Sequence, residues 1–448
     1  MELKKETKMF GEAWHALFVS LGILKRKPRK KETNERQLDD PEIYKPVLYG
    51  ISSSLIFRAL AANVITSSRV SLMLEIFKGN SSLAALELGK IRAVGAFLEF
   101  LIGPLFGNLS DAYGRKFGML PSALMNFISS TFILMNPVSL FAHWSLVLNI
   151  AFDTVFFAQM RAQMADCMSG RNIAENAFMH MAPAGLAMIS APWISGRLNA
   201  IQCYRMSSIV SLLTIWVLYN QEETLDESER RKVDLKACNP FAFLQLFTSG
   251  PTLLTLTLTS GIQTYTDSRL MENTATLMMK EKLNYSDKQV SGLLTRMAMT
   301  GFLGVPVGKY SIKTFGRTLH THISHIFKIV SYFVWSYLTG PTMQYAQWIL
   351  MFGTRQRDGT ETLMTEVGVA KGFGKGQMES YKMNWRSVTN FIAPLIYSRI
   401  FVYGKNVGRI HLPLYGAIAF TILSECIFTY GSLNYFDKEE DLKDVKFD

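Results

Sequence analysis

The sequence predicts an all-α membrane protein with about twelve transmembrane helices in two halves of six, preceded by an amphipathic helix. Three observations support this prediction. Apolar stretches about 20 residues long, the length that crosses a hydrocarbon core of about 30 Å, recur along the chain. Charged residues, 19% of the 448, gather mostly in the polar connections between these stretches. Two short motifs recur at matching places in the two halves, which is typical of duplicated membrane proteins.

The apolar stretches differ in length and in the number of charged residues they contain. The cleanest runs from Phe117 to Pro137 and contains no charged residue. The others cover residues 47–74, 91–106, 144–164, 178–198, 207–219, 252–274, 290–307, 327–338, 345–367, 383–403 and 412–430. Several contain charges or are short for a full span, so the count of twelve also draws on the family resemblance described below. The charges of Arg355–Glu361 are so dense that we expect that span to be broken or shifted.

Residues 1–45 form an N-terminal extension. Its apolar stretch, Met9–Leu24, is too short to span a membrane and is followed by the basic run Lys25–Lys31. This pattern suits a helix that lies at the membrane interface with its basic residues at the lipid head groups. A helix that docks a protein partner explains the pattern equally well.

The remaining chain divides at its longest charged interruption, Gln221–Gly250. We therefore expect a first six-helix half at residues 46–220, a cytoplasmic linker at 221–250, a second half at 251–434 and a charged tail at 435–448. The halves should resemble each other, and they do. Gly114-Arg115 recurs as Gly316-Arg317 and Ala191-Pro192 recurs as Ala393-Pro394, with the same spacing in each half.

The net charge of +11 does not indicate nucleic acid as a partner, because the basic residues lie beside apolar stretches rather than on one face or in one tail. If the helices alternate, most basic residues fall on one side, as the positive-inside rule requires. Both termini then face the cytoplasm or its equivalent, in the cell membrane or in an organellar membrane such as the mitochondrial inner membrane. Some lysines on the opposite side weaken this pattern, namely Lys78, Lys280, Lys282, Lys288 and Lys405.

The loop Gly107-Asn-Leu-Ser-Asp111-Ala-Tyr-Gly114-Arg115-Lys116 separates two apolar stretches. Glycine permits a tight turn, and a carboxylate beside a guanidinium can form charge-assisted hydrogen bonds near helix ends. This loop resembles the one between the second and third helices of the major facilitator superfamily. The resemblance implies a conformational latch, which in this chain would comprise Gly107, Asp111, Gly114, Arg115, Lys116, Asp166, Arg171 and Arg317.

The resemblance extends along most of the chain. Gly185–Leu198 is similar to the family's fifth helix, and Glu223-Thr224-Leu225 to the usual exit of the sixth. The proton-coupled drug and sugar transporters are closest in pattern. The helix-packing motif would comprise Ala191, Pro192 and Gly196, with Ala393 and Pro394 in the second half. The second loop departs from the pattern, since Lys313 replaces the carboxylate, so we expect a complete latch in the first half alone.

Ionisable residues inside apolar spans are costly and usually face a cavity, a partner or the interface. The candidates for a substrate or proton site are Arg58, Glu99, Asp153, Arg296, Asp358 and Glu361. Glu99 and Asp153 are the best candidates for protonation, because low dielectric favours the neutral carboxyl. Arg58 and Arg296 would pair with them or hold an anionic substrate group. Structural ion pairs and snorkelling side chains are the alternative interpretation.

Other features argue against enzymes and cofactor proteins. The sequence contains no phosphate-binding loop, dinucleotide fingerprint, nucleophile elbow or zinc motif, so we expect no catalytic activity, cofactor or metal. Four scattered cysteines suggest no disulfide framework. His320, His322 and His325 diverge around a helix, which favours histidines at the membrane interface over a metal site.

The resemblance implies a secondary transporter that moves a small solute by alternating access, with the substrate near the bilayer midplane between the halves. The alternative is a transporter-like subunit of a larger membrane complex that transports nothing. The altered second loop, the charged tenth span and the N-terminal extension motivate this alternative.

Overall fold

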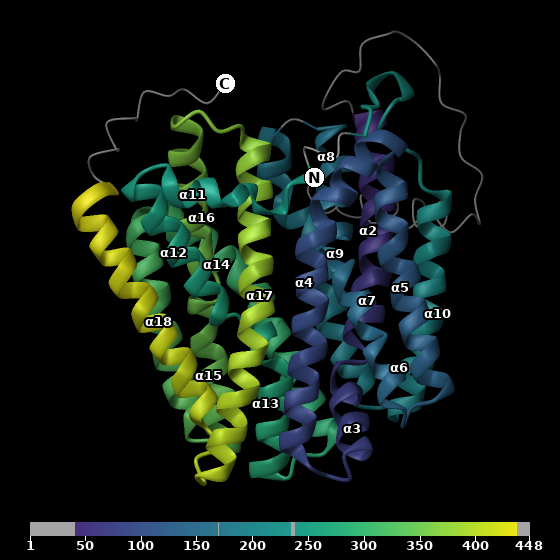
Figure 1. Ribbon diagram of the computed structural model, residues 1–448, viewed down its shortest axis with the longest axis vertical. Coiled ribbons are helices and arrows are strands. Elements are labelled where there is room, and N and C mark those ends of the chain that lie inside the picture. Colours follow the sequence, from purple (N-terminus) through teal and green to yellow (C-terminus); the bar gives the residue numbers. More distant parts are fainter. Residues whose placement is uncertain (1–40, 169, 234–237, 437–448) are drawn as a thin grey trace, which may run out of the picture. The chain divides into compact units, whose positions relative to one another are not determined.

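The computed structural model describes residues 41–168, 170–233 and 238–436, which are mainly helical and include no strand (Figure 1). Most of the predicted N-terminal extension, including its helix, and nearly all of the C-terminal tail lie outside these residues. Seven helical segments are long and apolar enough to cross a membrane: Lys45–Ile76, Ser81–Tyr113, Arg115–Met135, Leu140–Ala165, Ala200–Asn220, Asp287–Ser336 and Leu412–Phe436. The predicted all-α membrane class is therefore confirmed, while these seven do not establish a count of twelve.

Packing divides the chain into two compact units. The first contains residues 1–68 and 102–238, and the second contains 69–101 and 239–448. The segment 69–101 thus belongs with the second unit, although it precedes most of the first in sequence. The division falls inside two helices, α3 (Thr66–Ile76) and α4 (Ser81–Tyr113).

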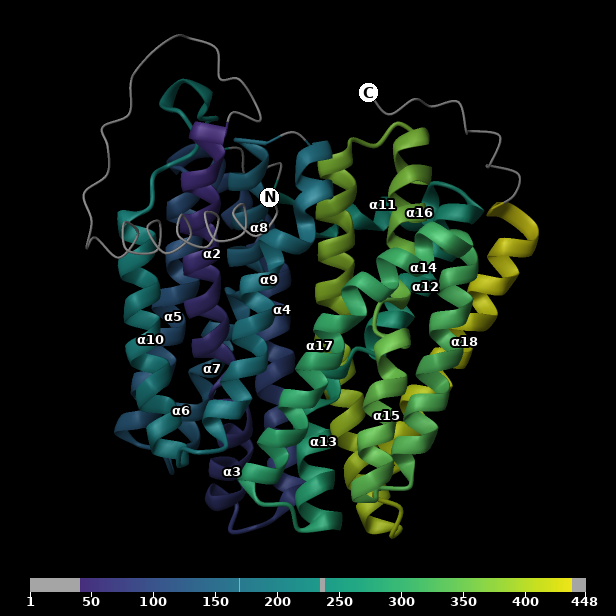
Figure 2. The same cartoon turned by 180° about the vertical axis from the view of Figure 1, so that it is seen from behind.

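The first unit is a bundle of helices around a core that includes Leu55, Met119 and Phe156. Its complete helices are α2 (Pro41–Asn63), α5 (Arg115–Met135), α6 (Leu140–Trp144), α7 (Leu146–Ala151), α8 (Asp153–Ala165), α9 (Gly170–Ser195), α10 (Ala200–Asn220) and η1 (Glu227–Glu229). Helices α5 and α10 lie side by side in both views (Figures 1 and 2). Small polar residues join them, since the hydroxyls of Ser130 and Ser207 are 2.8 Å apart.

The second unit has its own core around Leu253, Met364 and Phe428. Its complete elements are η3 (Pro240–Leu244), α11 (Gln245–Thr248), α12 (Pro251–Tyr265), α13 (Ser268–Leu283), α14 (Asp287–Ser336), α15 (Gly340–Gly353), α16 (Gln356–Ala370), α17 (Lys375–Asn406), α18 (Leu412–Gly431) and η4 (Ser432–Phe436).

Several helices are interrupted where the sequence carries glycine or charge. Gly316 has φ 75° and ψ 174°, so the helical geometry of α14 is broken there. The charged tenth stretch is divided into α15 and α16 at Thr354–Arg355, which confirms the expected break. A similar break at Thr266–Asp267 separates α12 from α13. Such irregular backbone at membrane depth is tolerated where protein or a cavity surrounds it.

The predicted packing motif lies at close helix contacts. Ala191 and Ala393 are fully buried, and Pro192 and Pro394 lie inside α9 and α17. A Cβ atom added to Gly89 of α4 would lie 3.1 Å from the Pro394 carbonyl oxygen, so these helices need glycine at that point. The amide of Gly196 donates to the Pro192 carbonyl (3.0 Å) just beyond the end of α9.

Candidate functional site: charged groups inside the helical units

Arg115 is the centre of the loop that joins α4 to α5. Its Nε donates to Asp166 Oδ2 at 3.0 Å, and Nη1 contacts Asp111 and the Ser110 hydroxyl. Asp166 lies just after α8, where its carboxylate also accepts a bond from the Thr224 hydroxyl (2.8 Å). The guanidinium therefore connects the start of α5 to the end of α8.

Glu223 completes this group, although the sequence indicated only that it marks the exit of a span. Its carboxylate accepts the backbone N–H groups of Arg115 (2.9 Å) and Lys116 (3.1 Å) and so caps α5. Gly114, with φ +109°, brings the chain close to this carboxylate. Gly107 has open space around its Cβ position. All these bonds lie inside the first unit.

The second copy of the loop uses a different carboxylate. Arg317 forms an ion pair with Glu366 of α16, although Lys313 occupies the place of the loop aspartate. Arg317 thus has an acidic partner from outside its loop, while the expectation of a complete latch in the first half alone stays a prediction. Helix α16 supplies a carboxylate to Arg317 much as the end of α8 supplies Asp166 to Arg115. The side chain of Arg171 lies outside the described residues.

Arg58 is the most buried of the six candidates for a substrate or proton site, with 2% of its surface exposed. Its guanidinium donates to Asp153 (2.7 Å), Asn149 (3.1 Å) and Ser122 (3.0 Å), which come from three different helices. The structure thus brings together Arg58 and Asp153, which are 95 residues apart in sequence.

Glu99 and Arg296 have other surroundings. Glu99 is 7% exposed and accepts a hydrogen bond from the Ser387 hydroxyl (2.8 Å) within the second unit. The Nε of Arg296 is buried and has no hydrogen-bond partner among the described residues. No ion pair joins Arg296 to a carboxylate in the described part of the chain.

Asp358 and Glu361 belong to a charged cluster at the start of α16. Arg355 donates to Asp358 at 2.5 Å. Glu361 accepts from two guanidinium groups, those of Arg357 (2.8 Å) and Arg386 (2.6 Å). Arg357 also approaches Asp267, with 3.6 Å between the nearest charged atoms.

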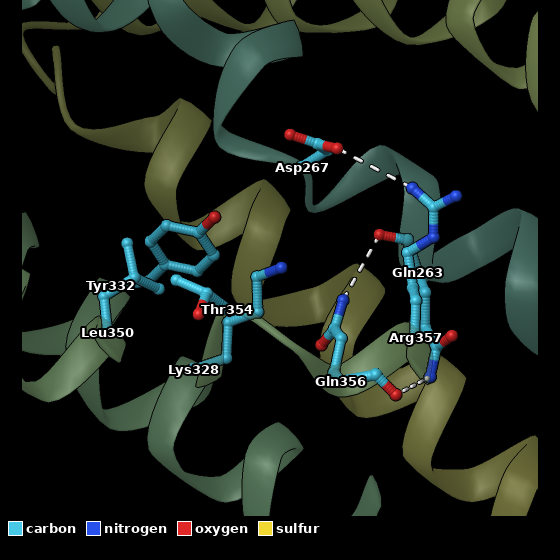
Figure 3. Close-up of a pocket in the computed structure, with 8 residues that line it drawn as sticks. All are labelled: Gln263, Asp267, Lys328, Tyr332, Leu350, Thr354, Gln356 and Arg357. Carbon is cyan, nitrogen blue, oxygen red and sulfur yellow. Dashed lines mark hydrogen bonds and ion pairs between the residues drawn. The ribbon is translucent and has the colours of Figure 1, made fainter. Parts of the chain in front are cut away.

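A cavity of about 70 Å³ lies beside this cluster, inside the second unit. Figure 3 shows the Lys328 ammonium on one side of it, with Asp267 and Arg357 on another. The complete lining is Gln263, Asp267, Lys328, Tyr332, Leu350, Thr354, Gln356 and Arg357. Its residues come from α12, α14, α15, α16 and the two helix breaks, so the breaks help to form the cavity.

Sequence reasoning missed Lys328, although this lysine lies in the apolar stretch 327–338. It is only 5% exposed. Gln263 and Gln356 were also missed because an uncharged amide in a span gives little signal. Their side-chain amides reach each other's backbone carbonyls, at 3.4 Å and 3.3 Å.

The three histidines have different surroundings. His320 and His325 are buried and His322 is half-buried, while their expected position at the membrane interface stays a prediction. His322 and His325 each place Nδ1 at 2.5 Å from a carboxylate oxygen of Glu425, a residue of α18 that the sequence did not single out. Glu425 thus gives the buried His325 ring a partner, and the buried His320 ring contacts the Ser311 hydroxyl (2.9 Å) and the Arg355 carbonyl (3.1 Å). No group able to hold a metal ion is found among the described residues.

Residues 51–359 match the sequence profile of the Major Facilitator Superfamily. This chain belongs to the major facilitator superfamily. The resemblance of the Gly107–Lys116 loop is thereby confirmed, and the protein is an integral membrane protein with the fold of a transporter family.

Individual relatives are distant. "Hippocampus abundant transcript-like protein 1" of Bos taurus is 23% identical over 287 residues, which are 61% of this chain and 55% of the relative. The class C tetracycline resistance protein of Escherichia coli is 27% identical over 165 residues, 36% of this chain and 41% of that protein. This chain thus spans about half the length of the curated relatives it matches.

The fold comparison covers more of the molecule. The crystal structure of the human organic anion transporter MFSD10 (TETRAN) superposes with a TM-score of 0.66, over 87% of this chain and all of that one. The sequence identity is 15%, so this similarity concerns the fold alone.

Proposed function

We propose that this major facilitator protein is a secondary transporter that moves a small solute across its membrane by alternating access. The observation that carries the proposal is the cavity beside Lys328. Buried charges in membrane helices are costly and usually mark a substrate or ion pathway. This cavity is walled by two cations and one carboxylate within the spans of a transporter fold.

The proposed transporter has twelve spans, and the length of α14 supports this count. Fifty helical residues would extend about 75 Å, far more than the core of about 30 Å. We therefore count α14 as two spans that reverse at Gly316. With α6–α8, α12–α13 and α15–α16 counted as single interrupted spans, and α2–α3 likewise, the total is twelve. An even count places both termini on one side, which the basic residues assign to the cytoplasm.

The proposed latch consists of the bonds of Arg115 and Arg317. Because each set lies within one unit, we propose that it keeps the helix ends of that unit together while the units change orientation. Two carboxylates remain candidates for proton binding. Glu99 is supported by its burial and its hydrogen bond from Ser387, and Asp153 by its pairing with the buried Arg58.

Reconstitution of the full chain in proteoliposomes tests the proposal. A panel of radiolabelled organic acids, sugars and cationic drugs would be offered under imposed proton and solute gradients. We expect saturable, protein-dependent uptake of at least one solute. Asp111→Asn should slow this uptake about tenfold, as expected for loss of a charge-assisted bond worth roughly 1.5 kcal/mol. Glu227→Gln is the matched control, because its side chain is 89% exposed in the same unit.

The alternative function, a subunit that transports nothing, predicts a different result. No solute would move under any gradient, and the protein would co-purify stoichiometrically with a larger complex bound through residues 1–45. Asp111→Asn would then leave assembly unchanged. That combination of results would reject the transporter proposal.

A further inference from the structure

Lys328 is a buried cation without a counter-ion of its own. Its side chain faces the cavity of the second unit (Figure 3), yet no carboxylate of a described residue lies within ion-pairing distance of its ammonium. The neighbouring carboxylates are already engaged. Asp267 faces Arg357 at 3.6 Å, and Glu361 is shared by Arg357 and Arg386.

Among the side chains that the structure describes, the charges around the cavity do not balance. Lys328, Arg357 and Arg386 are three cations, whereas Asp267 and Glu361 are two carboxylates. The nearby pairs Arg355–Asp358 and Lys382–Glu379 are each neutral as pairs and leave this difference unchanged. Because an unpaired charge is strongly disfavoured away from water, the site is complementary to one additional negative group.

Two glutamines that line the cavity provide hydrogen-bond acceptors for a ligand. The side-chain oxygens of Gln263 and Gln356 are buried and accept no hydrogen bond from any described residue. Their amide nitrogens are engaged, Gln263 with Thr360 (3.0 Å) and Gln356 with Thr266 (2.7 Å), so the oxygens are the free ends. Buried acceptors without donors favour a ligand that carries an O–H group.

We propose that this cavity binds a small hydroxylated carboxylic acid. The carboxylate pairs with the Lys328 ammonium, which has three N–H donors, and the hydroxyl donates to Gln263 or Gln356. A volume of about 70 Å³ restricts the bound part to a few heavy atoms. This inference rests on the proposed transport function and names the substrate class of that function.

Thermal unfolding of the full chain in lipid nanodiscs tests the site without any gradient. The probes are glycolate, acetate, which lacks the hydroxyl, and glycolamide, which lacks the charge, all at constant ionic strength. A ligand that binds only the folded protein raises the unfolding midpoint in a saturable way. We expect glycolate to bind most tightly, acetate more weakly and glycolamide most weakly.

Variants then assign the site. Lys328→Met should lower glycolate affinity at least about tenfold, as expected for loss of a charge-assisted bond. It should also raise the midpoint of the ligand-free protein, because it removes an unpaired buried charge, and this rise verifies folding. Lys328→Arg should retain part of the affinity. Lys309→Gln, an exposed lysine of the same helix, should leave it unchanged.

Any of four results would overturn the proposal or its glutamine part. Equal shifts with glycolate and glycolamide, or none with either, would reject an anion site, as would undiminished glycolate affinity in Lys328→Met. Equal affinity for glycolate and acetate would reject the role of the glutamines. None of these results would reject the proposed transport function, because the protein could still transport other solutes in proteoliposomes. Conversely, glycolate binding without any uptake would reject transport and keep the site.

Discussion

Arg58 illustrates how a guanidinium is kept inside the first unit. Its guanidinium donates three hydrogen bonds, one each to a side chain of α5, α7 and α8. Two of the acceptors, Ser122 and Asn149, are uncharged. The third partner, Asp153, supplies the opposite charge, although its side chain is 44% exposed against 3% for Arg58. The pair is thus asymmetric, and each partner should respond differently to substitution.

We predict that Asp153→Asn lowers the free energy of unfolding by about 1–2 kcal/mol, since Arg58 keeps its charge and loses the compensating one. Adding Arg58→Met to the Asp153→Asn variant should restore at least half of the lost free energy of unfolding, because no buried cation then remains at this site. Denaturant unfolding in detergent micelles measures both. Lys90→Gln, in an exposed pair on α4, is the control and should change little. No loss in Asp153→Asn would contradict the argument.

Single residues also mark the limit of prediction from sequence. The loop around Arg115 could be recognised from the sequence because its residues are contiguous and match a known pattern. The surroundings of Lys328, His325 and Glu425 could not be predicted, since they depend on partners far away in sequence. Glu425 meets His325 across 100 positions, and Gln263 meets His325 across 62. Only the fold brings such residues together.

At the scale of elements, the contacts that depend on particular residues lie at helix ends. Helix α5 begins with Arg115 and Lys116, whose amides are capped by Glu223 from beyond α10. This cap requires the backbone of Gly114 to approach the carboxylate with φ +109°, a conformation that side chains rarely allow. Glycine is therefore needed both for its dihedral angle and for space.

We predict that Gly114→Ala lowers the free energy of unfolding by about 1–3 kcal/mol. The new Cβ would lie 2.5 Å from Glu223 Oε2, so the cap must move as well as the backbone. Thermal unfolding followed by tryptophan fluorescence measures the effect. Gly103→Ala in α4, where nothing lies within 4 Å of the Cβ position, should be neutral or stabilising by up to about 1 kcal/mol. Similar midpoints for the two variants would refute this account.

The element boundaries were predicted unevenly. The break in the tenth stretch followed from the charges of Arg355–Glu361, which cannot continue an apolar helix facing lipid. The break at Thr266–Asp267 was not foreseen, because one aspartate in an apolar stretch is compatible with an unbroken helix. A residue distant in sequence accommodates this break, since the hydroxyl of Tyr332 donates to the Thr266 carbonyl at 2.7 Å.

At the scale of the whole molecule, the number of membrane crossings decides which loops share a side. Within the part of the chain that the structure describes, seven segments qualify as spans by length and apolar composition, and α14 counts among them as one. The twelve predicted stretches include several that are too polar to qualify alone. Hydropathy alone therefore does not establish the count of twelve, which stays a prediction.

Helix α14 offers a direct test of the count. If it reverses at Gly316, its two ends face one side of the membrane and Lys313 faces the other. A single crossing would place the two ends on opposite sides. We predict that Lys288→Cys and Tyr337→Cys react with a membrane-impermeant maleimide from the same side, and Lys313→Cys from the opposite side. All three positions are exposed in the folded chain.

The labelling would use oriented membrane vesicles and a background in which Cys238 and Cys426 are serine, because the other two cysteines are buried. A permeant maleimide is the control and should label all three positions equally. Positions 288 and 313 lie in α14 and position 337 directly follows it, so an error elsewhere in the topology cannot produce this pattern. Labelling of Lys288→Cys and Tyr337→Cys from opposite sides would reduce the count by one, and the two termini would then face different compartments.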